Sequence, residues 1–413
     1  MQQVTPPAPR RIETRCCVVG GGPAGMVLGL LLARAGVDVT VLEKHADFLR
    51  DFRGDTVHPS TLQAMHELGM LDDLLKLPHG EARQVEGQIG DHRFVLADFR
   101  RLTTRCKFIA FMPQWDFLNL IAAKASKYPE FRLAMRTAAT GLLETEGRVA
   151  GVTAASPDGP LEIRADVVVA CDGRYSTIRD AAGFVPQKFG APMDVLWFRL
   201  SRREGDGTDP AGRFDAGRIF IMINRGDHWQ CGYVIAKGSI AAIHARGLDA
   251  FRADVGRLAP ILADRVNEIA SFHDVSLLSV AVDRLPVWHR PGLLCIGDAA
   301  HAMSPVGGVG INLAVQDAIA AANILAEPLR ERRVTEADLV RVQKRREFPA
   351  RVTQRAQVAI QARVIGKVLS GDVALELPWP VRLLTKMPIL RTIPAYLLGI
   401  GVRPEHVRTR DRH

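Results

Sequence analysis

Short apolar runs that stop at glycine, each followed by a helical pattern, organise much of the chain. The run 16–19 leads into a glycine turn, and the pattern then predicts a helix over 23–34 and a second strand over 37–42. Two later apolar runs, 167–170 and 293–296, also stop beside an acidic residue and a glycine and precede predicted helices. This alternation predicts an α/β fold with a parallel sheet.

The stretch 186–284 has a different pattern, because its strand-like runs alternate apolar and polar positions. Such alternation predicts a sheet with one solvated or ligand-facing side. Bulky residues share faces of these runs, and core packing is the explanation we favour over a pocket. The residues in question are Trp197 with Arg199, and Trp229 with Cys231 and Tyr233.

The first turn carries Gly20-x-Gly22-x-x-Gly25 between a strand and a helix, with Glu43 at the end of the next strand. Gly20 suits a tight turn, Gly22 lets the backbone approach a pyrophosphate, and Gly25 permits close packing of helix on strand. Glu43 suits ribose hydroxyls and would repel a 2′-phosphate. The turn therefore predicts a site for FAD or NAD.

A second junction follows the run 167–170 and carries Asp172 and Gly173. Asp172 suits a nucleotide site, but it also suits a plain cap of the following helix. Upstream, Arg53 suits either a phosphate contact or an ordinary surface position.

The third junction combines the most features of a ligand site. Gly297-Asp298 leads to glycines at 307, 308 and 310 and to a helix that begins near Ile311. A glycine loop at a helix N-terminus presents free N–H donors to an anionic group. Asp298 can accept hydrogen bonds from sugar hydroxyls. The alternative is a loop that uses glycine only to turn.

Composition narrows the class of protein. The chain has 413 residues, a net charge of 54 − 45 = +9 and scattered arginines, which indicate an enzyme and no nucleic-acid partner. Six cysteines without a C-x-x-C pair predict free thiols, no metal site and a cytoplasmic location. The N-terminus has no apolar run of a secretion signal. We expect the apolar, proline-broken segment 375–402 to cap the fold or touch a membrane without spanning it.

The three motifs together resemble the class A FAD-dependent monooxygenases, the p-hydroxybenzoate hydroxylase superfamily. They are Gly-Gly-Gly-Pro-Ala-Gly with Glu43, Cys-Asp-Gly-x-x-Ser-x-x-Arg, and Gly-Asp-Ala-Ala-His-x-x-x-Pro-x-x-Gly-x-Gly-x-Asn, within about residues 13–350. The resemblance implies a Rossmann-like FAD-binding domain of the GR2 type, an inserted mostly β substrate domain and a C-terminal helical region. The implied boundaries are 12–83, 113–185 and 286–335 for the FAD domain, 84–112 and 186–285 for the substrate domain, and 336–413 for the helical region.

The resemblance also implies roles for individual residues. The pyrophosphate would lie at the first glycine turn and the ribose at Glu43, while Arg53 and Gln114 would reach the phosphate and ribityl region. Asp298 would hold the ribityl chain, and the backbone from Gly307 to Asn312 would face the flavin pyrimidine edge. The implied cofactor-binding set is Gly20, Gly22, Gly25, Glu43, Arg53, Gln114, Asp172, Gly173, Arg179, Asp298, Gly308, Gly310, Ile311 and Asn312.

The implied reaction is hydroxylation of an aromatic or polyketide-like substrate, with NADPH or NADH as a transient donor, O2, and a flavin C4a-hydroperoxide. No catalytic base can be assigned, and the candidates near the flavin are Pro305, Gly307, Thr56 and His58. A reductase of isoprenoid double bonds and a non-catalytic binding protein remain alternatives. A halogenase is disfavoured because the chain has no Trp-x-Trp-x-Ile stretch. The substrate, the donor and the oligomeric state stay open.

Overall fold

The computed structural model describes residues 9–49, 56–89, 92–206, 211–215, 217–370 and 379–413. The larger of its sheets has eight strands, in the order β19-β20-β11-β1-β2-β8, with β10 and β9 added beside β11. Strands β1, β2, β8, β11 and β20 pair in parallel. The bounds are β1 (Arg10–Val19), β2 (Val39–Leu42), β8 (Phe131–Ala134), β9 (Ala138–Thr145), β10 (Arg148–Ser156), β11 (Gly159–Ala170), β19 (His289–Arg290) and β20 (Leu293–Cys295).

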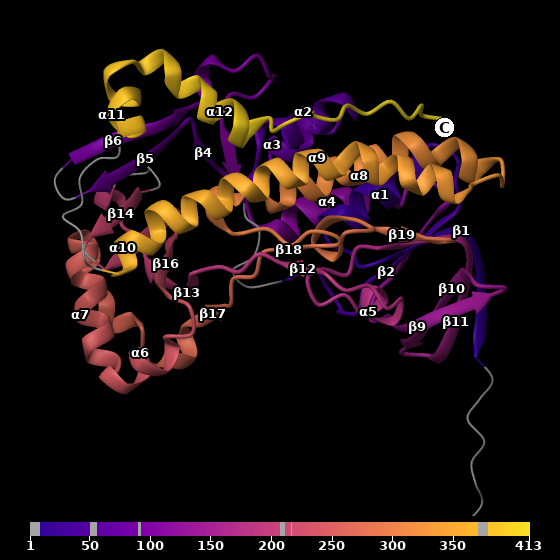
Figure 1. Cartoon of the computed structure of the whole chain (residues 1–413), viewed down its shortest axis with the longest axis horizontal. Coiled ribbons are helices and arrows are strands. Elements are labelled where there is room, and N and C mark those ends of the chain that lie inside the picture. Colours follow the sequence, from indigo (N-terminus) through magenta and orange to yellow (C-terminus); the bar gives the residue numbers. More distant parts are fainter. Residues whose placement is uncertain (1–8, 50–55, 90–91, 207–210, 216, 371–378) are drawn as a thin grey trace, which may run out of the picture.

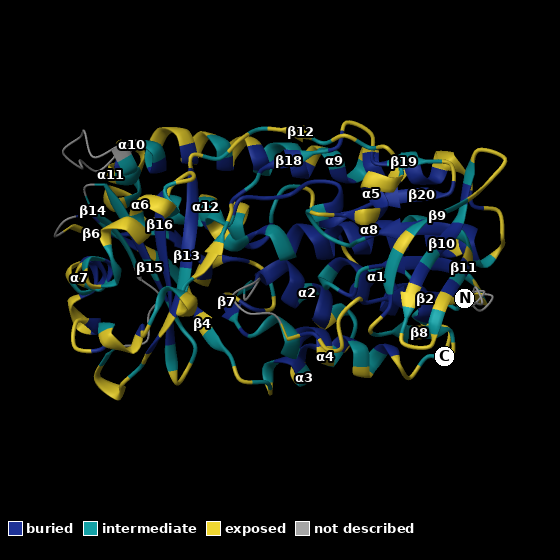
Figure 2. Ribbon diagram, turned by 90° about the horizontal axis from the view of Figure 1, so that it is seen from below, coloured by how far each residue is buried: buried dark blue, intermediate teal, exposed yellow. Residues whose placement is uncertain are grey.

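Helices α1 (Pro23–Arg34) and α8 (Gly310–Arg330) pack against each other, and their residues are largely buried (Figure 2). The neighbouring helix is α4 (Gln114–Ala125). Among the described residues, the segment 306–330 is the one helix long and apolar enough to cross a membrane, and 78% of its apolar window is buried inside the fold. A core helix meets the same criterion. The α/β architecture predicted from the strand and helix pattern is confirmed.

The second sheet has seven strands in the order β17-β13-β16-β15-β14-β5-β6. One face packs on α6 (Ile240–Arg246) and α7 (Leu248–Leu258), and Trp229, Cys231 and Tyr233 lie in that core as predicted. Within 186–284, the run 275–282 has a strand-like pattern that predicts a strand over its whole length. That prediction is wrong in extent, because only three of these residues form a strand. The bounds are β5 (Gln84–Ile89), β6 (His92–Asp98), β13 (Met193–Ser201), β14 (Ala211–Asp215), β15 (Arg218–Asn224), β16 (His228–Ala236) and β17 (Ser276–Leu278).

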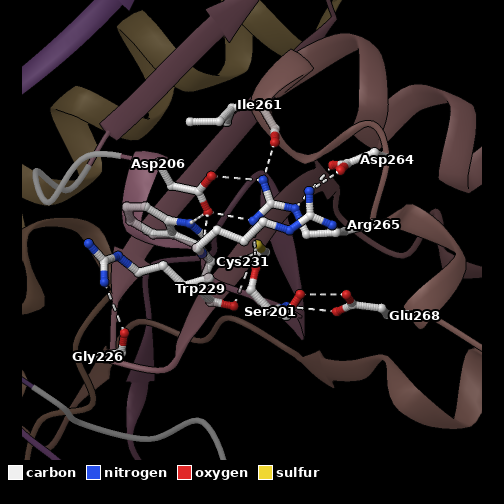
Figure 3. A network of polar contacts seen from close by, with 11 residues as sticks. Ser201, Asp206, Gly226, Trp229, Cys231, Ile261, Asp264, Arg265 and Glu268 are labelled. Carbon is white, nitrogen blue, oxygen red and sulfur yellow. Dashed lines mark hydrogen bonds and ion pairs between the residues drawn. The ribbon is translucent and has the colours of Figure 1, made fainter.

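A buried ion pair anchors the turns beside this sheet (Figure 3). Arg265 contacts both carboxylate oxygens of Asp206, and the two side chains are 3% and 6% exposed. The same guanidinium donates to the Ser201 carbonyl at 2.9 Å, and the Trp229 indole donates to Asp206 at 3.1 Å. The bonds to Arg265 hold the pKa of Asp206 well below its usual range. Both oxygens of the carboxylate are thus paired, which is the condition for burying its charge.

Smaller elements connect the two sheets. They are the sheet β3 (Thr56–Val57), β7 (Ile109–Phe111) and β4 (Gly80–Ala82), the pair β12 (Gln187–Lys188) and β18 (Asp283–Arg284), and helices α2 (Pro59–Glu67), α3 (Leu71–Leu75) and α5 (Thr177–Ala181). The strands of each large sheet come from the segments proposed for the FAD and substrate domains, apart from the first two residues of β1. Strand β7 lies in the proposed substrate segment 84–112 but pairs with β3 and β4. The sheet composition supports the boundaries, which stay a proposal.

The C-terminal region is helical, as predicted. Helix α9 (Glu336–Ile360) runs along the molecule from the side of the eight-stranded sheet to the seven-stranded sheet, where a π-helical turn (Gln361–Ile365) leads into α10 (Gly366–Ser370) (Figure 1). Helices α11 (Trp379–Lys386) and α12 (Thr392–Gly399) follow and pack on β6. The last residues return along the FAD side, where Arg34 pairs with Asp411.

Candidate active site

The first glycine turn has the conformation that its spacing predicts. Gly20 has a φ of +108°, which favours glycine, and Gly25 lies so close that an added Cβ would be 1.9 Å from the Gly20 carbonyl oxygen. At Gly22, in contrast, an added Cβ would meet no atom of the described residues within 4 Å. In the described part of the chain, no side chain caps the N-terminus of α1 at this turn. The turn therefore combines open space with free helix N–H donors, which suits a phosphate group.

Glu43 lies at the end of β2 and is buried behind the same turn. Its two oxygens accept hydrogen bonds from the backbone N–H of Gly21 at 3.0 Å and of His45 at 2.9 Å. Glu43 thus fixes the shape of the turn. A carboxylate has about four lone-pair sites, so further acceptor capacity is left for a ribose hydroxyl.

The second junction uses Asp172 to hold the start of α5. Its oxygens accept from the Ser176 hydroxyl at 2.5 Å and from the Ile178 N–H at 3.2 Å. Burial raises the pKa of Asp172, although these two bonds oppose the effect. The N-cap of α5 is Ser176, whose hydroxyl accepts from the Arg179 N–H, so Asp172 supports the cap and is not the cap itself. Gly173 adopts φ +85°, with open space where a Cβ would be.

Arg179 is the cation of this junction. Its side chain is 7% exposed, and it contacts Asp180 and the Arg174 carbonyl. Its Nη1 is buried without a hydrogen-bond partner among the described residues. A buried guanidinium N–H that lacks a partner is a position where a ligand oxygen would be stabilised.

The third junction brings Asp298 and the glycine loop together with the segment after β3. Asp298 pairs with Arg174 at 3.5 Å. Gly307 and Gly308 have φ values of +79° and +64°, and the Thr56 hydroxyl donates to the Gly308 carbonyl at 3.0 Å. Among the residues that the structure describes, no side chain caps α8, which begins at Gly310. We call the stretch 302–308 the flavin-side loop, because the resemblance predicts the flavin ring beside its glycines.

Asn312 lies within the first turn of α8 and is buried. Its side-chain oxygen accepts from Ser60 at 2.6 Å and from Thr61 at 2.7 Å, which ties α8 to α2. The neighbouring Ile311 is half-buried, and Pro305 immediately precedes a short 3-10 turn (Val306–Gly308). Gln114 begins α4 and is half-buried. Arg53 lies outside the described residues.

His58 lies near the Gly308 carbonyl of the flavin-side loop and the Leu398 carbonyl of α12. Its ring is fully buried, and Nδ1 lies 2.8 Å from the Leu398 carbonyl of α12. Burial lowers its pKa to about 4, while the Leu398 and Gly308 carbonyls oppose that effect. Because a carbonyl only accepts, Nδ1 donates and the neutral ring leaves Nε2 as an acceptor. Nε2 has no hydrogen-bond partner among the described residues.

Sequence reasoning missed the glutamines at the end of α9 that hold the flavin-side loop. Gln354 donates to the carbonyl of Ala302 at 3.0 Å, and Gln357 donates to the carbonyls of Ser304 and Val306. Gln361, in the π-helical turn, donates to the Ser304 hydroxyl at 2.5 Å. All three are buried. Their spacing of three and four positions was a readable signal, since it places amides on one helix face.

A buried ionic network beneath the same loop was also missed. Asp317 accepts from the Gly297 N–H at 3.0 Å, lies 2.5 Å from His301 Nε2 and accepts from Arg346 at 2.9 Å. Burial would raise the pKa of Asp317, but His301 and Arg346 together hold it below its usual value. Arg346 follows Asp317 by 346 − 317 = 29 positions and lies on another helix, so local spacing could not reveal the pair.

Comparison with known proteins identifies the family. The model of a family described as an FAD binding domain matches residues 13–356. The 6-methylpretetramide 4-monooxygenase of Streptomyces rimosus is 34% identical over 390 residues, which cover 92% of this chain and 91% of that protein. The chain belongs to the class A FAD-dependent monooxygenases. The predicted family, FAD cofactor and enzyme class are thereby confirmed.

Other proteins similar to this monooxygenase carry different names. PqsL of P. aeruginosa, in complex with 2-aminobenzoylacetate, superposes with a TM-score of 0.74 at 19% identity and covers 88% of this chain and 100% of its own. Digeranylgeranylglycerophospholipid reductase 1 of Methanopyrus kandleri is 28% identical over 83% of this chain and 88% of its own. At 19% identity, PqsL is informative about the fold alone.

The residues present fit FAD. The first turn offers open space at Gly22 and an uncapped helix N-terminus, which suit a pyrophosphate. Arg179 offers a buried N–H without a partner among the described residues. The uncapped N-terminus of α8 suits the negative charge of a reduced flavin ring.

Proposed function

We propose that this monooxygenase hydroxylates a fused-ring, polyketide-type aromatic with NADPH or NADH and O2. The main support for the proposal is the similarity to 6-methylpretetramide 4-monooxygenase, which spans nearly the whole length of both chains. The seven-stranded sheet supports it, because the face toward the flavin-side loop carries apolar residues such as Trp197 and Ile221, which pack with Val306 of that loop. A neutral aromatic compound suits such a surface.

The same three junctions would hold the cofactor. We propose the N-terminus of α1 with Gly22 for the pyrophosphate, Glu43 for the adenosine ribose and Asp298 for the ribityl chain. The remaining proposed contributors are Arg53, Gln114, Asp172, Gly173 and Arg179, with the bonds that Asp172 makes at the start of α5 counting against it. When bound, FAD supplies the hydride acceptance and the oxygen activation that no side chain can supply.

The chain's own residues would stabilise developing negative charge and hold the flavin-side loop in place. Free N–H groups in the first turn of α8, at 310–312, would face developing negative charge, where fixed donors act strongly in a water-poor site. Thr56 fixes the flavin-side loop through the Gly308 carbonyl, and His58 joins the loop to α12. Pro305 and Gly307 complete the turn. We assign none of these residues as a catalytic base.

The location of the protein is proposed on two observations. All six cysteines are free, as in proteins of a reducing cytoplasm. The segment from α11 to α12 exposes apolar residues and also carries basic ones, which are Trp379, Ile389 and Ile393 together with Arg382, Lys386 and Arg391. Such a segment supports a peripheral contact with anionic lipid within 375–402, of which 375–378 lie outside the described residues. Cosedimentation with phosphatidylglycerol vesicles, but not phosphatidylcholine vesicles, is the expected result.

The activity is tested by following NADH and NADPH absorbance together with dissolved oxygen. We expect slow oxidation alone and a sharp rise with a suitable fused-ring phenol, because a site that reacts only when filled avoids release of peroxide. Donor oxidation without oxygen uptake would instead support an isoprenoid-type reductase. A colourless protein that takes up no FAD would support a non-catalytic binding protein.

A further inference from the structure

One row of residues crosses six strands of the seven-stranded sheet and is unusually rich in glycine. Directly paired residues of neighbouring strands point to the same face of a sheet. Five successive pairings connect this row from β13 to β6. In order, its members are Trp197, Gly232, Ile221, Gly212, Gly87 and Phe94.

The glycines let aromatic rings lie flat on the sheet. A Cβ added at Gly232 would come within 2.9 Å of the Trp197 ring, and one added at Gly87 would come within 2.6 Å of the Phe94 ring. Each ring therefore lies over the neighbouring glycine. Gly212, between them, would place such a Cβ in ordinary van der Waals contact, 3.7 Å from the Phe214 ring and 3.8 Å from the Glu86 carbonyl among the described residues. A bare glycine thus keeps the surface low at this point. We call the six residues of this row the aromatic floor.

The length of the aromatic floor favours a long planar ligand. Its two rings lie over β16 and β5, which are three strand spacings apart in the sheet order. With about 4.8 Å for each spacing, the rings are about 14 Å apart. A single aromatic ring cannot contact both ends, whereas several rings fused in a line can.

The aromatic floor belongs to the face of the sheet that meets the flavin-side loop. The opposite face packs on α6 and α7. On the side of the floor, Trp197 and Ile221 pack in one cluster with Val306 of the flavin-side loop and Ile365 of the π-helical turn. The aromatic floor therefore lies beside the residues that the proposed function places next to the flavin ring.

Two buried polar atoms at this junction lack partners among the described residues. One is the indole Nε1 of Trp197, which can only donate, and the other is the amide Oε1 of Gln361, which can only accept. Gln361 bonds to Ser304, two residues before Val306. Buried polar atoms are normally paired, so an unpaired donor and acceptor beside an apolar surface indicate the hydroxyl or carbonyl groups of a ligand.

We propose that the aromatic floor binds the fused rings of the substrate and that Trp197 determines specificity by donating to a ring oxygen. This proposal rests on the proposed function, because it names the binding surface for that substrate class. It predicts selection for flat, linearly fused aromatics that carry a hydroxyl or a carbonyl group. Trp197 acts as a positioning residue for such a ligand.

The test measures equilibrium binding of quinizarin, a flat hydroxylated anthraquinone, to the FAD-loaded enzyme by the fluorescence of the probe. Gly212→Val adds a branched side chain to the aromatic floor beside the Phe214 ring. Its Cβ makes only ordinary van der Waals contacts among the described residues, and the φ of Gly212 is not positive. We expect the dissociation constant to rise about tenfold or more, as a steric conflict of about 1.4 kcal/mol or more would cause. Gly205→Val, at an exposed glycine where an added Cβ meets no described atom within 4 Å, should bind as the wild type does.

Trp197→Phe keeps a ring and removes the N–H. Binding of quinizarin should weaken about threefold to tenfold, as expected for one hydrogen bond, while binding of anthracene should not change. The proposal is overturned if the wild type does not bind quinizarin or if Gly212→Val binds it equally well. Tight binding without any stimulated oxygen uptake would contradict the proposed function and leave the aromatic floor standing. Oxygen uptake stimulated by single-ring phenols, without quinizarin binding, would contradict the aromatic floor and leave the monooxygenase activity standing.

Discussion

The two large sheets use glycine in different ways. In the eight-stranded sheet, Gly20, Gly22 and Gly25 lie within one turn, and this turn alone provides the features that suit a phosphate group. In the seven-stranded sheet, Gly87 and Gly232 are 232 − 87 = 145 positions apart in sequence, and only strand pairing brings them into one row. The chemistry of a local motif can be inferred from neighbouring residues in the sequence. A surface formed by strand pairing cannot be inferred in this way.

The largest effects are expected from substitutions within the first glycine turn. Gly25→Ala would place a Cβ 1.9 Å from a backbone oxygen, so we expect loss of FAD together with a large loss of stability. Gly22→Ala meets open space and should keep the fold while weakening FAD binding, because it obstructs the approach of a ligand to the backbone. Thermal unfolding of the FAD-free proteins and flavin titration separate the two effects. Equal stability of both variants would contradict the turn's assigned packing.

The contrast between local and long-range support also explains what the sequence could predict. The strand–turn–helix around Gly20, the acid at Glu43 and the loop before α8 depend on neighbours in sequence, so their elements and the cofactor followed from spacing and resemblance. The extent of β17 could not be read, because the apolar run continues past the last paired residue. Gln357 and Arg346 could not be assigned partners either, since those partners come from distant segments.

The long-range support of the flavin-side loop is tested at Arg346. Arg346→Met leaves the carboxylates of Asp317 and Glu405 without this buried partner, and we expect unfolding to become easier by about 3 to 5 kcal/mol. The control is Arg341→Met, because Arg341 is 63% exposed and pairs with Asp338 at the surface. That change should cost at most about 1 kcal/mol. Denaturant unfolding measures both, and similar losses would mean that the buried network gives no special support.

The smaller effects on cofactor binding concern single acceptors. Asp298→Ala and Glu43→Ala should each weaken FAD retention by roughly 1.5 to 3 kcal/mol, the cost of one charged hydrogen-bond partner. Glu43→Ala should also loosen the turn, because Glu43 accepts from Gly21 and His45. Flavin fluorescence during dialysis measures the retention. Full occupancy in both variants would show that neither carboxylate holds the sugar.

The link between the flavin-side loop and α12 predicts that stability depends on pH. The pKa of His58 falls from 6.5 to about 4 on folding, so between these values the unfolded chain binds more protons than the folded chain. Stability should therefore rise with pH across this window, by up to about 1.4 kcal/mol per pH unit from this group. His58→Asn removes the titration and should flatten that part of the profile. An unchanged slope in the variant would rule out His58 as its source.

Isotopic labelling would show directly whether the enzyme transfers an oxygen atom from O2 to its substrate. The enzyme would be supplied with NADPH or NADH, labelled oxygen gas and the fused-ring phenol that most stimulates donor oxidation, and the products would be analysed by mass spectrometry. We predict a hydroxylated product that carries one labelled oxygen atom for each donor molecule oxidised. Label found only in hydrogen peroxide, or a product that gains hydrogen without oxygen, would contradict this prediction.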